Sequence, residues 1–135
     1  MNFHLDTNVV IGLLNANPEY RARYEQLRAR GEETAVSSVV VFELWYGVAR
    51  SKRVAQNARA LRLFLETLVN VLPFTSEDAV AAGEIRASLK KTGSPIGPYD
   101  VLIAGQALRM GATLVTANIA EFERVRGLEW QDWSR

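Results

Sequence analysis

The sequence contains no cysteine and only one histidine, His4. Without cysteine the chain can form no disulfide, no thiolate nucleophile and no cysteine-based zinc site. A single histidine excludes a mechanism that uses two histidines as general acid and base. The sequence also lacks a Walker phosphate-binding loop and a Gly-x-Ser-x-Gly nucleophile elbow. Carboxylates are therefore the main candidates for catalysis.

Long apolar runs are missing as well. No apolar run approaches the roughly 18 residues that a membrane span needs, and the N-terminus lacks the basic and apolar regions of a signal peptide. We therefore expect a cytoplasmic protein that does not contact a membrane. The 135 residues contain no linker, repeat or low-complexity segment, which predicts a single domain over residues 1–135.

The net charge is only +1, but the basic residues are unevenly distributed. The segment 44–65 contains no acidic residue and five basic ones: Arg50, Lys52, Arg53, Arg59 and Arg62. A second basic group follows Pro18 and consists of Arg21, Arg23, Arg28 and Arg30. Basic groups beside an acidic pocket suit a polyanionic ligand. For any single arginine, a solvated helix face explains the charge equally well.

Short apolar runs alternate with longer helical patterns along the whole chain. Strands are predicted at 2–5, 34–37, 71–74 and 113–115, with a short fifth at 128–131. Helices are predicted after each of the first three strands, including one capped by Ser38 and one over 98–110. Parallel neighbours need such crossover helices. The pattern predicts an α/β fold with a central parallel sheet of four to five strands and helices on both faces.

Four acidic residues lie inside or beside apolar sequence: Asp6, Glu43, Asp100 and Glu121. Burying an ionised carboxylate is costly unless it is paired, hydrogen-bonded, protonated or bound to metal. Asp6 and Glu121 follow predicted strands, and the carboxyl ends of parallel strands are where open α/β sheets bind ligands. Hard oxygen ligands suit Mg²⁺ or Mn²⁺, and such ions activate water against phosphodiesters. We therefore treat the four as candidate catalytic residues.

Each acid also has a structural interpretation. Asp6 could cap the following helix, and Asp100 in a first helical turn favours the helix dipole. Asn118 and Glu121 have capping-box spacing. Glu43 is hardest to explain in this way, because it falls on the apolar side of its helix.

Short polar residues accompany the acids at the same two strand ends: Thr7, Asn8, Thr116 and Asn118. They could orient the carboxylates from a second shell around a metal, or simply cap and turn the chain. For His4, a packed and hydrogen-bonded role in the core is favoured over a role in the site, although strand alternation places it on the side of Asp6.

Several ordered motifs resemble the PIN-domain ribonucleases, and specifically the VapC-type toxins of type II toxin–antitoxin pairs. They are Leu5-Asp6-Thr7-Asn8, the 38–47 stretch with Glu43-Leu44 and Tyr46-Gly47, the 93–104 stretch with Asp100, and the 114–122 stretch with Asn118 and Glu121. The resemblance covers essentially the whole chain. It implies a three-layer sandwich and a metal-dependent endoribonuclease.

The resemblance implies that Asp6, Glu43 and Asp100 hold Mg²⁺, with Mn²⁺ as a substitute. Many PIN domains have Asp where this chain has Asn118, so the fourth carboxylate is either Glu121 or absent. The expected partners are an RNA substrate such as tRNA or rRNA, a cognate antitoxin, a second copy in a homodimer, and DNA only through the antitoxin.

Two further expectations concern individual residues. Gly105 stands in a helix where relatives usually have Ala, and should cost about 1 kcal/mol of stability. A groove fringed by Phe42, Trp45 and Tyr46 could receive the antitoxin, although such residues more often belong to the core.

Other functional classes stay open. A catalytically silent RNA- or protein-binding module would keep the fold without cleaving RNA. An aspartic protease needs two Asp-Thr-Gly-like segments and this chain has one, Asp6-Thr7-Asn8. An aspartyl phosphatase usually requires Asp-x-Asp, and residue 8 is Asn.

Overall fold

The computed structural model describes residues 2–134. Its centre is a parallel sheet of five strands in the order β3-β2-β1-β4-β5. The strands are β1 (Asn2–Leu5), β2 (Glu33–Ser37), β3 (Asn70–Leu72), β4 (Thr113–Val115) and β5 (Glu129–Gln131). The predicted parallel sheet, including its short fifth strand, is confirmed.

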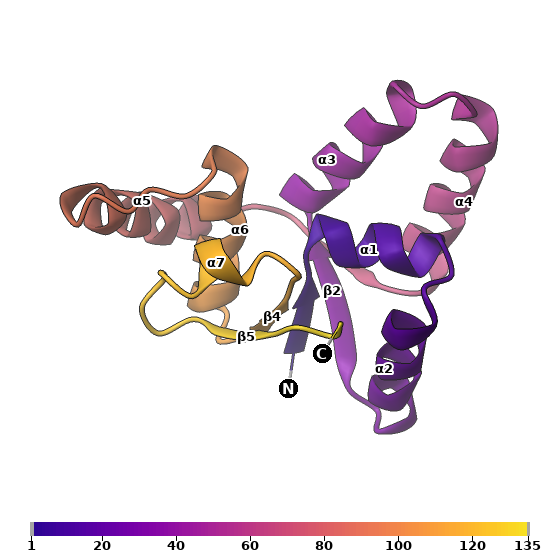
Figure 1. Ribbon diagram of the computed structural model, residues 1–135, viewed down its shortest axis with the longest axis horizontal. Coiled ribbons are helices and arrows are strands. Elements are labelled where there is room, and N and C mark those ends of the chain that lie inside the picture. The colour runs from indigo at the N-terminus through magenta and orange to yellow at the C-terminus, as the bar shows by residue number, and fades with distance from the viewer. Residues whose placement is uncertain (1, 135) are drawn as a thin grey trace.

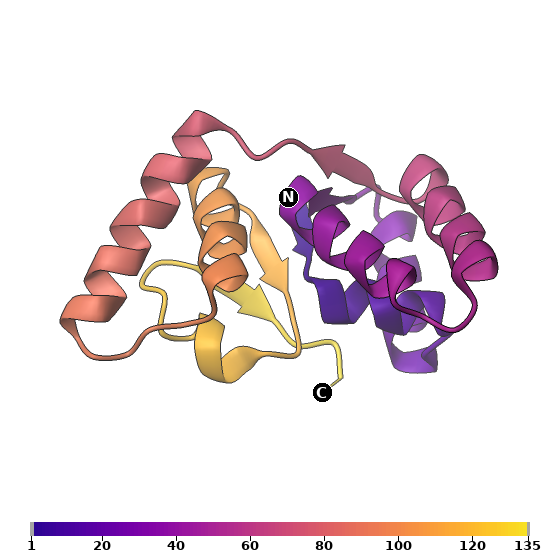
Figure 2. The same ribbon diagram turned by 90° about the horizontal axis from the view of Figure 1, so that it is seen from above.

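Helices cover both faces of the sheet, as Figures 1 and 2 show. On one side lie α1 (Thr7–Leu14), α2 (Pro18–Ala29), α3 (Ser38–Ala49) and α4 (Val54–Thr67). On the other lie α5 (Ser76–Lys91), α6 (Pro98–Arg109) and the short α7 (Ile119–Phe122). This division follows from right-handed crossovers, because the chain moves outward from β1 to β3 and then crosses back to β4. The three-layer sandwich is therefore confirmed. Within residues 2–134, no helix has the length and apolarity needed to cross a membrane.

Local sequence signals account for most helix starts. The Asn17 side chain accepts hydrogen bonds from the first turn of α2, and Thr75 and Asp78 form a reciprocal capping box at α5. The expected cap at Ser38 is wrong by one residue: Ser37 caps α3, and the Ser38 hydroxyl instead accepts from the Phe74 N–H at 2.9 Å. Ser38 thus ties α3 to the segment after β3.

The central strand β1 is buried on both faces, as expected for a parallel sheet covered by helices. Phe3, His4 and Leu5 all lie in the core. The prediction that His4 packs inside is confirmed. However, it is not fully hydrogen-bonded, because its Nε2 has no partner among the described residues.

Gly105 has a packing role that the sequence did not reveal. It lies in α6 where that helix crosses α5, and a Cβ at this position would come within 2.7 Å of the Ala82 backbone N and Cα. The expectation that this glycine mainly costs stability is therefore wrong. Its missing side chain lets the two helix backbones approach closely.

Candidate active site

The site lies where β1 and β4 end side by side. The chain leaves β1 toward β2 and leaves β4 toward β5, in opposite directions across the sheet. Such a switch point opens a crevice at the carboxyl ends of the strands. The first residue after β1 is Asp6, whose N–H bonds to the Val115 carbonyl at 2.9 Å, and the first residue after β4 is Thr116.

Asp6 is held by donors from both strand ends. Its side chain is only 3% exposed. Oδ1 accepts from the Thr7 N–H at 2.8 Å, and Oδ2 accepts from the Thr116 hydroxyl at 2.7 Å and the Asn8 amide at 3.3 Å. Asp6 therefore caps α1, as its structural interpretation predicted, and also faces the site. Burial, assisted by the Glu43 charge, raises the pKa of Asp6 against the opposing effect of its hydrogen bonds.

Glu43 reaches the same region from α3, half-buried rather than fully enclosed. The Thr7 hydroxyl donates to Glu43 Oε1 at 2.7 Å. The backbone of Thr7 binds Asp6 while its side chain binds Glu43. One threonine thus fixes two acids relative to each other.

Asp100 and Glu121 form a hydrogen-bonded carboxyl pair. Burial and the adjacent Glu121 carboxylate raise the pKa of Asp100 to about 8, and the charges of Asp6 and Glu43 act in the same direction. The hydrogen bond from Asp100 lowers the pKa of Glu121. The pairing thus favours the protonated form of Asp100 and the ionised form of Glu121.

Asn118 is part of this pair and does not cap α7 through its side chain. Its amide donates to Glu121 Oε2 at 2.9 Å and lies 3.5 Å from Asp100 Oδ2. The capping-box interpretation of Asn118 and Glu121 is therefore wrong. The Asn118 amide instead binds the Glu121 carboxylate directly.

The remaining polar residues complete a continuous network. The Thr116 hydroxyl, besides donating to Asp6, accepts from the Asn118 N–H at 2.9 Å, and Asn8 Oδ1 accepts from the Ala117 N–H at 3.1 Å. All four predicted orienting residues thus contact an acid or its support. The structure brings the four predicted acids into one electrostatically coupled group, which we call the acid cluster.

The acid cluster suits a divalent cation. As the side chains of residues 2–134 stand, no group of three or more acidic or histidine residues is arranged to hold a metal ion. Mg²⁺, however, keeps several waters and typically uses only one or two carboxylates. The raised pKa of Asp6 and Asp100 shows that both carboxylates lack sufficient compensating positive charge. A cation would supply it.

Comparison with known proteins decides the family. The PIN domain family model matches residues 4–128. This chain belongs to the PIN-domain family. The relatives of this PIN domain include Ribonuclease VapC2 of Rickettsia felis, 38% identical with all of both chains covered. They also include the tRNA(fMet)-specific endonuclease VapC of Salmonella typhimurium, 37% identical with 98% of both chains covered.

Solved structures agree with this assignment. A chain in the crystal structure of VapBC2 from Rickettsia felis bound to a promoter DNA fragment superposes with a TM-score of 0.92 at 38% identity, covering 98% of this chain and 99% of that one. DNA-bound VapBC from Salmonella typhimurium gives 0.90 at 35% identity, covering 98% of both. This PIN domain is therefore a member of the VapC group.

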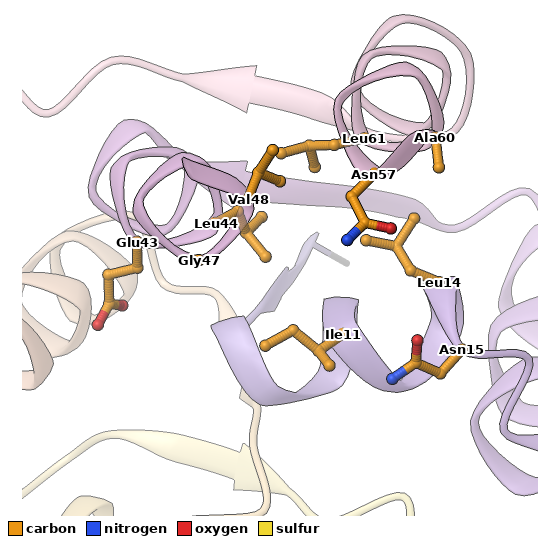
Figure 3. Close-up of a pocket in the computed structure, with 10 residues that line it drawn as sticks. All are labelled: Ile11, Leu14, Asn15, Glu43, Leu44, Gly47, Val48, Asn57, Ala60 and Leu61. Carbon is orange, nitrogen blue, oxygen red and sulfur yellow. The ribbon is translucent and has the colours of Figure 1, made fainter. Parts of the chain in front are cut away.

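A groove of about 270 Å³ lies beside the acid cluster of this PIN domain, between α1, α3 and α4 (Figure 3). Its apolar wall includes Ile11, Leu14, Leu44, Val48 and Leu61. Glu43 stands at one end and, in Figure 3, points away from the groove. The predicted fringe of Phe42, Trp45 and Tyr46 does not line it.

Nor do those three aromatic residues all belong to the core, which was the alternative interpretation. Phe42 and Tyr46 are exposed, and only Trp45 packs partly against the core. The Arg62 guanidinium lies 5.2 Å from the centre of the Trp45 ring, so this member of the first basic group joins α4 to α3. Arg28 of the second group lies over Tyr24 in a similar way, at 5.9 Å.

Proposed function

We propose that this chain is the toxin of a type II toxin–antitoxin pair, an endoribonuclease that hydrolyses RNA phosphodiester bonds with metal-activated water. The observation that carries the proposal is the acid cluster at the switch point of a PIN fold. The VapC relatives, matched over their full length, support the same activity.

In this proposal Asp6, Glu43 and Asp100 hold Mg²⁺, and Mn²⁺ can replace it. The cation would neutralise the scissile phosphate and lower the pKa of a bound water. Thr7 and Thr116 hold Glu43 and Asp6 in place through hydroxyl hydrogen bonds of 2.7 Å each. Glu121 pairs with Asp100, and the hydrogen bond from Asn118 fixes the Glu121 carboxylate in place.

The wider surroundings suit an RNA strand in the cytoplasm. Arg50, Lys52 and Arg53 lie at the α3–α4 connection, and no acidic residue occurs between Leu44 and Leu65. Positive charge next to a metal site attracts a phosphate backbone. Relatives include a tRNA(fMet)-specific endonuclease, so tRNA is the first substrate to test. We also expect a homodimer.

A cognate antitoxin would bind in the groove between α1, α3 and α4. The groove has a largely apolar wall, is also lined by Asn15 and Asn57, and has Glu43 at one end. An amphipathic antitoxin segment lying there could place a basic side chain beside the acid cluster. The similar solved structures of VapBC2 from Rickettsia felis and VapBC from Salmonella typhimurium support a cognate antitoxin as the partner.

The test is cleavage of total cellular RNA by the purified chain with Mg²⁺, Mn²⁺ or EDTA. Asp6→Asn and Asp100→Asn should abolish metal-dependent cleavage, while Glu123→Gln, an exposed acid two residues from Glu121, should not. Circular dichroism of each variant verifies the fold. Full activity in both site variants would refute the proposal.

A silent binding module is the alternative. It predicts no cleavage with any metal, together with RNA affinity that falls as salt rises.

A further inference from the structure

Within residues 2–134, the exposed aromatic side chains all lie on α3 and α6, the two helices that carry Glu43 and Asp100. Among the aromatic residues of the described chain, three are exposed: Phe42 at 52%, Tyr46 at 61% and Tyr99 at 46%. Phe42 directly precedes Glu43, Tyr46 lies one helical turn beyond it, and Tyr99 directly precedes Asp100. We call these three residues the aromatic surface. Exposed rings carry a solvation cost, so their concentration at one site points to a ligand.

Phe42 and Tyr99 join the two helices that carry Glu43 and Asp100. Their ring centres are 5.4 Å apart at an interplanar angle of 61°, an edge-to-face contact between α3 and α6. This contact leaves a large part of each ring open to solvent. The ring pair therefore links the helix of Glu43 to the helix of Asp100 while staying accessible to a ligand.

A basic residue continues the aromatic surface along α3. Phe42, Tyr46 and Arg50 are spaced by four residues and so lie on one side of the helix, over a length of about 12 Å. The Arg50 guanidinium lies 5.2 Å from the centre of the Tyr46 ring. Arg50 also begins the acid-free basic segment that continues with Lys52 and Arg53. Rings followed by positive charge match the bases and backbone of a single nucleic-acid strand.

We propose that the aromatic surface stacks unpaired bases of the RNA strand next to the scissile phosphate, and that Arg50 contacts the backbone of that strand. The inference rests on the proposed nuclease function, which places the scissile phosphate at the acid cluster. Bases within a duplex are already stacked, so this surface selects nucleotides that are unpaired at the cut. It positions the substrate without taking part in the chemistry.

Binding is measured on the full chain carrying Asp6→Asn, which we expect to bind RNA without cutting it. The probe is a single-stranded RNA oligonucleotide containing 2-aminopurine, whose fluorescence falls on stacking; the same RNA as a duplex is the comparison. Phe42→Ala and Tyr99→Ala should each weaken binding of the single strand by about fivefold or more and reduce the quenching. Phe42→Tyr and Tyr99→Phe keep the rings and should restore both signals. Leu63→Ala, at an exposed α4 position (62%), is the control.

Arg50→Ala should lower affinity for all sequences alike and reduce the slope of log affinity against log salt by about one. Unchanged affinity and quenching in Phe42→Ala and Tyr99→Ala would overturn the inference. So would light scattering showing that these variants change the oligomeric state, because the rings would then contact a second copy.

A cleavage assay on the chain with Asp6 intact distinguishes failure of the stacking role from failure of the proposed nuclease function. If that chain cuts RNA and the alanine variants cut with the same KM and kcat, the stacking role fails and the nuclease stands. If it cuts nothing with any metal while quenching still depends on the rings, the nuclease fails and the binding surface stands.

Discussion

Replacing Gly105 by alanine should destabilise this protein, although alanine is the better helix former. In α6 the change gains about 1 kcal/mol of helix propensity. The new Cβ, however, would lie 2.7 Å from the Ala82 N and Cα and 2.8 Å from its Cβ, so the backbone of α5 must move. Overpacking of this kind costs about 1–3 kcal/mol. Because backbone atoms yield less easily than a flexible side chain, we expect a net loss of about 1–2 kcal/mol.

The matched control is Gly83→Ala, in α5 next to Ala82. A Cβ at Gly83 meets nothing within 4 Å. Only the propensity gain remains there, so this variant should be more stable by up to about 1 kcal/mol. The two glycine-to-alanine changes should therefore have opposite signs.

Thermal unfolding followed by circular dichroism measures both. For a domain of this size 1 kcal/mol corresponds to about 3–5 °C in Tm, so Gly105→Ala should lower Tm by about 3–10 °C and Gly83→Ala should raise it slightly. A rise in Tm for Gly105→Ala would refute the close approach of α5 and α6.

Three other predictions concern the acids and their supports. Mg²⁺ affinity, measured by calorimetry, should rise between about pH 6 and pH 8 and level off above pH 8. The reason is that Asp100, whose pKa is raised to about 8, must lose its proton before the Asp100–Glu121 pair can bind the ion. An affinity that does not change with pH would contradict a protonated Asp100–Glu121 pair. Thr116→Val should weaken Mg²⁺ binding about 10–100-fold by removing the hydroxyl that orients Asp6, while Thr116→Ser should retain it. Burial alone would raise the pKa of Asp78, but hydrogen bonds from Thr75 and Arg109 outweigh it and lower the pKa. The stability that the ionised Asp78 carboxylate contributes is thus present above the ordinary aspartate pKa and is lost as the pH falls below that value. Asp78→Asn should cost about 1–3 kcal/mol at neutral pH, allowing for the partial exposure of Arg109, and little at low pH, by urea unfolding.

The sequence predicted the sheet and most helix bounds because its signals are local. Pro18 after Asn17, and the Thr75 to Asp78 capping box, act within one helical turn and so can be read directly. The four acids stood out for a similar reason, because each interrupts apolar sequence.

What the sequence could not reveal depends on contacts between distant segments. The role of Gly105 follows from Ala82 on another helix, and the bonds of Asn118 follow from Asp100. Exposure of Phe42 depends on which side of α3 the sheet covers, and an almost wholly apolar helix has no periodicity from which to read that side. A signal for Asn118 did exist, since it stands among the short polar residues that follow β4.

The hydrogen bond between Asp6 and Thr116 joins residues 110 positions apart in the chain. During synthesis, β1 and Asp6 leave the ribosome well before β4 and have no β4 beside them until residues 113–115 have been made. Glu121 and its partner Asn118 emerge later still. A growing or prematurely terminated chain thus lacks the complete acid cluster, and we expect it to be harmless to the ribosome and RNAs around it. Toxicity would begin only once the segment that carries Thr116, Asn118 and Glu121 has been made and has folded against β1.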